Sequence, residues 1–310
     1  MSDMVVEPLP GAPFGARITG LDPTSITDEQ QAAIEVAHRE RHGLLCFDFG
    51  RLLDADELHA LTALFGPSEY APGLITGIGK GAVAGEAPRS VAEQEAALRQ
   101  RGVDPFLTFL GNVDPHTLEP RPVPEEFFGE WEWHTDMSYI EVPPTFSLLH
   151  SRIVPEGGGD TGFCSQVMAA AALPDGLRSR IGDRRLKHDS TYASSGILRP
   201  GMEVPADPRE AVGRYHPIIR RLPTGHEALF LGRRTNGYIE GLELDESEAL
   251  LDELWAHATD EAFTYRHRWT VGQVVVWDNR MLLHRRHPFA PDDVRLMWRT
   301  QTRGEAVVAA

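Results

Sequence analysis

The chain has 310 residues, of which 41% are apolar and 25% are charged, and its formal net charge is −16. This composition is typical of a globular protein with a sizeable core, and the negative charge argues against nucleic acid or an anionic membrane as the main partner. With Cys46 and Cys164 as its two cysteines, the chain is expected to contain neither a disulfide framework nor a cysteine-type zinc site.

The first ten residues show no basic segment followed by an apolar run. No apolar stretch approaches the roughly 18 residues that span a bilayer. We therefore expect a cytoplasmic protein without a signal peptide or a membrane span.

The first seventy residues predict alternating strands and helices. A short strand is expected over 13–22, and the apolar run 43–47 predicts a buried strand. Two capping boxes, Thr27 with Gln30 and Asp54 with Glu57, predict helices over about 28–41 and from 54 to Gly66.

Residues 67–130 are less regular. They hold a segment rich in glycine and small residues (73–85), a charged segment that predicts a helix (91–101), a candidate strand (106–110) and four prolines between Pro115 and Pro124. Long irregular segments in compact domains are usually functional lids or disordered. Its place just before the motif described below favours a lid, and a flexible surface insertion is the alternative.

The second half predicts mostly strands. They are expected over 146–154, in a hairpin (215–231) around the turn Pro223–Gly225, and over 263–269, 274–277 and 295–302. Helices are expected near 167–172 and after a capping box at Asp245 and Glu248. The glycine-rich turn 157–162 lacks the Lys-Ser/Thr ending of a phosphate-binding loop. These elements indicate a mainly β fold with peripheral helices, a sandwich or barrel, in one domain over 1–310.

Within Trp131–Ile140, His134 and Asp136 are two residues apart. In a strand, such residues project from the same face. A second histidine from elsewhere would complete a set of two histidines and one carboxylate, which is diagnostic of non-haem Fe(II). The His-x-Asp pair alone is a weak signal, and a hydrogen-bonded pair at a strand end is the alternative.

A second segment, Gly272–His287, supplies the missing histidine, because His284 follows a hydrophobic strand and a polar turn. Further along, Arg295 and Arg299 are separated by an even number of residues, so a strand would place both on one face. Buried arginine is costly unless it meets an anion, and its forked guanidinium suits a carboxylate. The alternative is that these arginines pair with some of the 46 acidic residues. Asp278 and Asn279 are interpreted as turn formers.

Several motifs occur together and in order: Trp-His-Thr-Asp (133–136), Pro143-Pro144, Gly-Gly-Asp-Thr (158–161), Trp-Asp-Asn-Arg (277–280), His284, Arg295 and Arg299. In this order they resemble the Fe(II)/2-oxoglutarate-dependent taurine dioxygenase and dichlorophenoxyacetate dioxygenase family, from Gly15 to about Arg303. The resemblance implies a double-stranded β-helix, or jelly roll.

The resemblance also implies the functional groups. Fe(II) would be held by His134, Asp136 and His284, with no catalytic side chain expected beyond these ligands. The distal carboxylate of the cosubstrate 2-oxoglutarate would be held by Thr161 and Arg295, with O2 as the other cosubstrate. Candidate substrate-binding or pocket-wall residues are Arg299, Tyr139 and Trp277.

The chain departs from the taurine-type pattern after Phe65-Gly66. There, Pro67-Ser68-Glu69-Tyr70 lacks the histidine that helps read a sulfonate in those relatives. Taurine is therefore not the expected substrate, and Tyr70 remains a candidate pocket residue. The aromatic side chains nearby suit a bulkier or aromatic substrate, unless they belong to the core: Phe127, Phe128, Trp131 and Trp133.

We therefore expect a dioxygenase that hydroxylates an aliphatic C–H of a small anionic substrate, such as a sulfonate, a sulfate ester or an aryloxy acid, with succinate and CO2 as coproducts. Cleavage of a C–S or C–O bond would follow if the hydroxylated carbon carries sulfur or oxygen. A homo-oligomer, dimer or tetramer, is expected. The alternatives are a biosynthetic 2-oxoglutarate oxygenase for a larger substrate, a zinc-type hydrolase with the same ligands, and a jelly-roll binding protein without activity.

Overall fold

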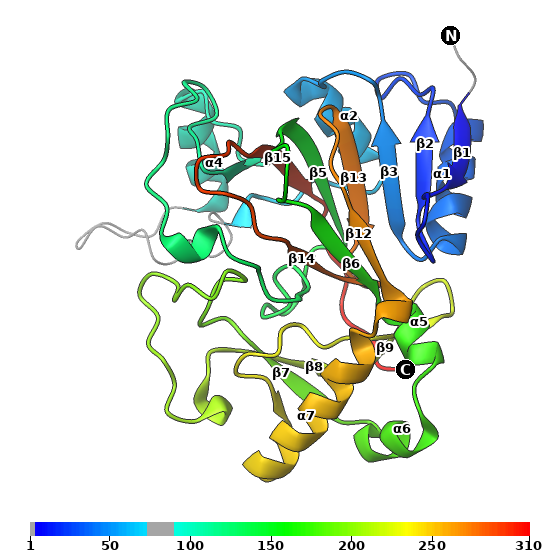
Figure 1. Ribbon diagram of the computed structural model, residues 1–310, viewed down its shortest axis with the longest axis vertical. Coiled ribbons are helices and arrows are strands. Elements are labelled where there is room, and N and C mark those ends of the chain that lie inside the picture. The colour runs from blue at the N-terminus through cyan, green and yellow to red at the C-terminus, as the bar shows by residue number, and fades with distance from the viewer. Residues whose placement is uncertain (1–3, 73–89) are drawn as a thin grey trace.

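The computed structural model describes residues 4–72 and 90–310 (Figure 1). Part of the expected lid, 73–89, lies outside the described residues. The strands are β1 (Val5–Pro8), β2 (Ala16–Thr19), β3 (Leu44–Asp48), β4 (Thr108–Gly111), β5 (Phe146–Ile153), β6 (Thr161–Ser165), β7 (Arg185–Asp189), β8 (Gly213–Pro217), β9 (Ile219–Arg221), β10 (Glu227–Leu229), β11 (Tyr238–Ile239), β12 (Thr264–His267), β13 (Gln273–Asp278), β14 (Leu282–Arg286) and β15 (Leu296–Gln301). The helices are α1 (Asp28–Glu40), α2 (Ala55–Ala63), α4 (Val91–Gln100), α5 (Gln166–Ala171), α6 (Asp175–Ile181) and α7 (Leu244–Ala258), with short 3₁₀ turns η1 (Glu125–Phe127), η2 (Pro208–Glu210) and η3 (Glu261–Phe263).

A seven-stranded sheet in the order β1-β2-β3-β13-β5-β15-β4 forms the main wall of the molecule. Its pairs are antiparallel except for β2 and β3, which are parallel. The apolar run of β3 is buried on both sides: Leu44 and Cys46 belong to one core cluster, and Leu45 and Phe47 to another that α1 and α2 cover. A strand buried on both faces reads as a continuous apolar run, so the buried strand predicted for 43–47 is confirmed.

A three-stranded sheet, β12-β6-β14, faces the inner side of the main wall. The cluster between them joins Phe163 of β6 and Leu282 of β14 to Val275 and Trp277 of β13. Figure 1 shows these strands beside one another in the centre of the molecule. Because β14 carries His284, this packing brings the second predicted histidine into the space between the sheets.

Helix starts follow the local sequence in two of the three predicted cases. Thr27 and Asp54 form the predicted capping boxes of α1 and α2. The box predicted at Asp245 and Glu248 is wrong, because α7 begins after Glu243 without a side-chain cap. Asp245 lies instead in the first turn, where a negative charge complements the helix dipole, and Glu248 pairs with Arg234 at 2.6 Å.

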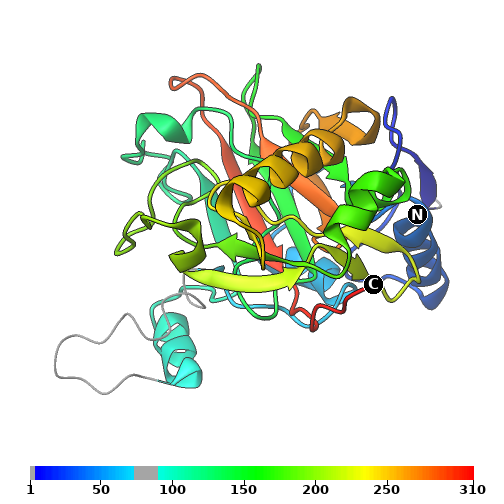
Figure 2. The same ribbon diagram turned by 90° about the horizontal axis from the view of Figure 1, so that it is seen from below.

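A third core cluster lies under α5, α6 and α7. In Figure 1 α7 lies at the bottom of the molecule, and in Figure 2 it faces the viewer. The stripe expected along this helix is buried as expected: Leu251, Leu254, Trp255 and Ala258.

Some elements were not anticipated from the sequence, notably β1, β6, β7 and β14. The hairpin predicted over 215–231 is found only in part: β9 and β10 pair around the expected turn, whereas β8 pairs with β7. Within the residues described, no helix is both long enough and apolar enough to cross a bilayer.

Candidate metal centre and active-site cavity

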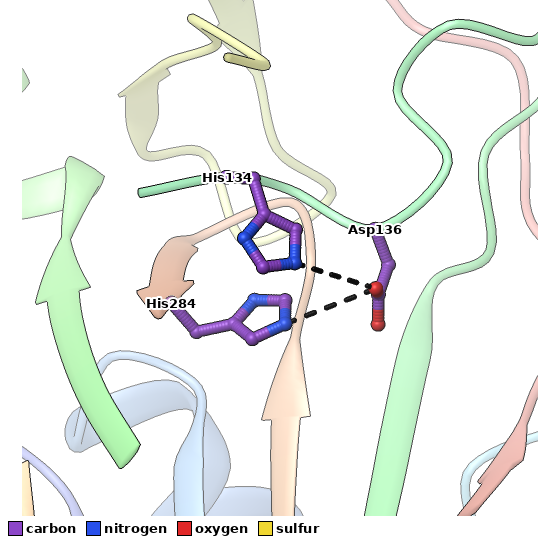
Figure 3. Close-up of side chains that lie close together, drawn as sticks. All are labelled: His134, Asp136 and His284. Atoms are coloured by element: carbon purple, nitrogen blue, oxygen red, sulfur yellow. Dashed lines mark ion pairs between the residues drawn. The ribbon is translucent and has the colours of Figure 1, made fainter. Parts of the chain in front are cut away.

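The structure brings the three predicted metal-binding side chains together. Nε2 of His134 lies 3.9 Å from Oδ1 of Asp136, and Nε2 of His284 lies 3.8 Å from the same oxygen. The three candidate ligand atoms lie within 4.8 Å of one another, and all three residues are buried. Figure 3 shows the two imidazole edges and the carboxylate converging on one point.

The backbone achieves this convergence in a way that differs from the expected strand. His134 and His284 form a single isolated bridge, with reciprocal backbone N–H···O=C bonds of 2.9 Å. Residues directly opposite in such a bridge project to the same side, and the two ring centroids are 4.1 Å apart. The chain then turns at Asp136, where Met137 adopts a φ of 49°. The turn, rather than strand alternation, carries the carboxylate beside the imidazoles.

Hydrogen bonds fix the orientation of the first imidazole. His134 donates from Nδ1 to the carbonyl oxygen of Glu132 at 2.8 Å. Because a carbonyl can only accept, Nδ1 carries the proton and Nε2 keeps its lone pair for a metal. Nδ1 of His284 is buried and has no hydrogen-bond partner among the described residues.

Both oxygens of the Asp136 carboxylate have partners besides the histidines. Its Oδ2 accepts from Ser147 at 2.8 Å and from Nε2 of Gln301 at 3.3 Å. Arg299 lies 3.4 Å from Oδ1. These contacts leave Oδ1 directed toward the two imidazoles.

The electrostatic environment sets the protonation states that metal ligands need. Burial lowers the pKa of His134 and of His284, so both imidazoles are neutral near pH 7. Burial would raise the pKa of Asp136, but the charge of nearby Arg299, together with the hydrogen bond from Ser147, holds that pKa below its usual range. Two neutral nitrogen donors and one charged oxygen donor therefore fit a divalent transition metal that keeps open coordination positions.

A cavity of about 330 Å³ lies beside the triad and includes His134 and His284 in its wall. Among the described residues its lining contains no aspartate or glutamate, although the whole chain is strongly acidic. The cationic residues of the lining are Arg121, Arg286, Arg295 and Arg299. The aromatic residues of the lining are Phe109, Phe127, Trp131 and Trp277. The cavity thus suits an anion that also has apolar surface.

Thr161 and Arg295, predicted to hold the cosubstrate carboxylate, line this cavity together. The Thr161 hydroxyl accepts from Nε1 of Trp269 at 3.0 Å. Arg295 is buried, and its guanidinium donates from Nε to the carbonyl oxygen of Gly159 at 3.1 Å. No carboxylate of the described residues forms an ion pair with it, and burial lowers its pKa to about 9. A buried, unpaired cation of this kind favours an incoming anion.

The glycine-rich turn 157–162 makes room for this arginine. Gly159 has a φ of +67°, and a Cβ added there would lie 3.2 Å from Cδ of Arg295. A side chain at this position would be strained by the positive φ and would press against Arg295. The turn packs against Arg295 and accepts a hydrogen bond from it. The glycine-rich segment 157–162, to which the sequence assigned no function, thus has a structural role.

The structure brings two of the four candidate substrate residues to the cavity. Arg299 lines it, and so does Trp277, whose ring centroid is 4.7 Å from that of His284. Tyr70 is not among the lining residues; its hydroxyl donates to Glu95 at 2.6 Å. Tyr139 borders a separate surface cavity, and its hydroxyl accepts from Arg199.

Sequence reasoning missed several residues of the site. Asn279, interpreted as a turn former, is buried and donates to Ser147 at 2.9 Å, and so supports the serine that holds Asp136. Arg121 and Arg286 also line the cavity and were not predicted as site residues. Arg286 lies two residues after His284. In a strand, residues two apart share a face, so this spacing could have identified Arg286.

Of the four nearby aromatic residues, two belong to the cavity and two do not. Phe127 and Trp131 line it. Phe128 packs against Phe289, and the ring of Trp133 contacts the guanidinium of Arg285 at 4.6 Å.

A family model described as taurine catabolism dioxygenase TauD, TfdA family, matches residues 6–301. The chain is 37% identical over 184 residues to the alpha-ketoglutarate-dependent 2,4-dichlorophenoxyacetate dioxygenase of Cupriavidus pinatubonensis; the match covers 58% of this chain and 63% of that relative, less than two thirds of its length. It is 29% identical to the (S)-phenoxypropionate/alpha-ketoglutarate-dioxygenase of Delftia acidovorans over 96% of this chain and 97% of that one.

Among solved structures, AAD-2 in complex with Mn(II) and N-oxalylglycine superposes with a TM-score of 0.74 at 23% identity, covering all of both chains. This likeness concerns the fold. Together with the family match it confirms the expected mainly β jelly roll with peripheral helices.

Proposed function

Because the chain belongs to the TauD/TfdA family and is a 2-oxoglutarate-dependent dioxygenase, we propose that it binds Fe(II) through His134, Asp136 and His284 and hydroxylates an anionic aryloxy acid. The observation that carries the proposal is the cavity beside the triad, whose wall combines arginines with aromatic rings. Membership in the family sets aside the hydrolase and the inactive binding protein that the residues alone left open.

Charge and shape support this choice of substrate. The cosubstrate is a dianion, and the buried Arg295 with Thr161 suits its distal carboxylate. Arg121 is exposed at the cavity wall and remains available for the anionic group of a second ligand. The rings of Phe109, Phe127 and Trp131 offer flat apolar surface for an aryl group. A cavity of about 330 Å³ favours a small substrate over the larger biosynthetic one.

The chain's own residues bind and orient the reactants. A bound Fe(II) would supply open coordination positions and couple oxidative decarboxylation of 2-oxoglutarate to hydroxylation of a C–H bond. The bond from His134 to Glu132 fixes the first ring, and Ser147 orients the Asp136 carboxylate. Phe127 and Trp131 contribute apolar surface to the cavity wall.

Hydroxylation next to an ether oxygen leads to bond cleavage without further catalysis. An aryloxyacetate hydroxylated at its methylene is a hemiacetal, whose C–O bond breaks to release the phenol. The balanced reaction converts aryloxyacetate, 2-oxoglutarate and O2 to phenol, glyoxylate, succinate and CO2.

A substrate comparison tests the proposal. Succinate and phenol release would be measured with an aryloxyacetate, its neutral methyl ester, an alkyl sulfate ester and an alkanesulfonate. We expect the aryloxyacetate to give the highest kcat/KM, with phenol and succinate formed in equal amounts and the ester inactive. A higher kcat/KM with the sulfate ester or the sulfonate would show that the aryloxy assignment is wrong.

A further inference from the structure

Arg286 is a buried cation that none of the roles above explains. It ends β14, two residues after His284, and lies directly opposite Thr161 in the pairing of β14 with β6. Its side chain therefore projects to the same face as these two residues. It is 5% exposed and lines the same cavity as Arg295.

The surroundings of Arg286 hold its guanidinium in place but do not neutralise it. The group lies 5.0 Å from the ring centroid of Phe127, 4.7 Å from that of Trp131 and 4.8 Å from that of Phe289. Nη2 donates to the carbonyl oxygens of Phe127 and Gly129. Nε and Nη1 are buried without a hydrogen-bond partner among the described residues, and no carboxylate there pairs with the group. Unpaired buried donors of a charged group are costly.

The positive charges of Arg286 and Arg295 therefore lie near each other in the cavity wall. Burial is the main cause of the lowered pKa of Arg295, and the neighbouring charge of Arg286 lowers it further. Asp160, the acidic neighbour of Arg295, already accepts from Arg266 at 2.7 Å. An anion that enters between the two guanidiniums would relieve their repulsion and satisfy Nε and Nη1 of Arg286.

We propose that Arg286 is a second cationic contact for the distal carboxylate of 2-oxoglutarate, acting as a positioning residue together with Arg295 and Thr161. The inference rests on the proposed roles of Arg295 and Thr161. The strand register favours this ligand over the substrate, because Arg286 lies directly opposite Thr161 and both line the cavity with Arg295.

Equilibrium binding to the Mn(II)-loaded protein tests the inference without turnover. Isothermal titration would compare N-oxalylglycine, which carries a distal carboxylate, with N-ethyloxamate, which has the same chelating end and lacks that carboxylate. In Arg286→Gln the affinity for N-oxalylglycine should fall about tenfold or more, as expected for loss of a charge-assisted hydrogen bond. The affinity for N-ethyloxamate should stay within about twofold, because its chelating end is untouched. Arg286→Lys, which keeps the charge and loses the fork, should give an intermediate affinity.

Arg285→Gln is the matched control. Arg285 is the neighbour on the same strand but faces the other way, pairing with Glu130 at 3.1 Å. Neither affinity should change in this variant.

Two results would overturn the inference. They are an unchanged affinity of Arg286→Gln for N-oxalylglycine, and an equal loss of affinity for N-oxalylglycine and N-ethyloxamate. In both cases the proposed function stands. Failure of the unmodified Mn(II) protein to bind N-oxalylglycine would overturn the proposed cosubstrate site itself, and this inference with it.

Discussion

The carboxylate of Asp136 depends on side chains from two strands of the main sheet. Ser147 on β5 and Gln301 on β15 both donate to Oδ2, and Gln301 also donates to Ser147 at 2.9 Å. Partners of this kind orient a metal ligand and tune its basicity. Residues that never touch the metal therefore contribute to the affinity of the site.

Replacing Ser147 tests that dependence. Ser147→Ala should weaken metal affinity about 10-fold to 100-fold, because Asp136 loses its shortest hydrogen bond. The measurement is metal affinity by competition with a chelator. Ser151→Ala is the control, since this buried serine on the same strand donates to Thr270 and does not reach Asp136. Equal affinities in the two variants would contradict the role of Ser147.

Replacing a histidine of the triad tests the assignment of the centre. His134→Ala should abolish substrate-dependent succinate release, because two donors cannot hold the metal in a defined geometry. Circular dichroism would check that the fold is retained. His59→Ala is the control, since this histidine pairs with Asp104 at 2.5 Å, away from the triad. Retained 2-oxoglutarate turnover in His134→Ala would exclude the triad.

For single residues, the sequence could predict that His134, Asp136 and His284 lie together and that Arg295 lies near them. These residues belong to motifs that occur in the order typical of the family. The sequence could not predict Ser147 or Gln301, since a serine or glutamine in a strand has no pattern that points to a distant carboxylate. Arg286 lies between these cases. Its residue type and its spacing from His284 were visible, but β14 was not predicted as a strand.

At the scale of elements, apolar patterning predicted the strands with buried faces, such as β3 and β13, and capping boxes predicted the starts of α1 and α2. β14 was not predicted as a strand because three of its five residues are basic. A strand that lines a cationic cavity on one face lacks the apolar alternation by which strands are found. The bridge between His134 and His284 was not predicted because it depends on long-range packing rather than on local sequence.

The turn before β6 offers a test at this scale. Gly159→Ala should raise the KM for 2-oxoglutarate about fivefold or more, and cost about 1 kcal/mol of stability, because a side chain at positive φ is strained and would push against Arg295. Steady-state kinetics and urea unfolding measure the two effects. Gly157→Ala is the control, since a Cβ there meets nothing within 4 Å. Similar kinetics in the two variants would show that the turn does not position Arg295.

For the whole molecule, buried histidines link stability to pH. Burial lowers the pKa of His150 and of His267 to about 4, from an ordinary value of 6.5. Between these values the unfolded chain binds protons that the folded chain does not, so stability is full above pH 6.5 and is lost as the pH falls toward 4.

The free energy of unfolding of the metal-free protein should therefore decrease by up to about 1.4 kcal/mol per pH unit for each of these histidines in that window. Urea unfolding at pH 7.5, 6, 5 and 4.5 measures the slope. A free energy of unfolding that does not change across this range would show that both side chains titrate in the folded protein.

The bridge between His134 and His284 is a single reciprocal pair of hydrogen bonds that joins segments far apart along the chain. An ion held by both side chains would be a removable cross-link between these two segments. Chelation would remove that cross-link, and we expect the two backbone hydrogen bonds to open more often in the metal-free protein. Hydrogen exchange at the amides of His134 and His284 would report the loss of metal directly, independently of any substrate.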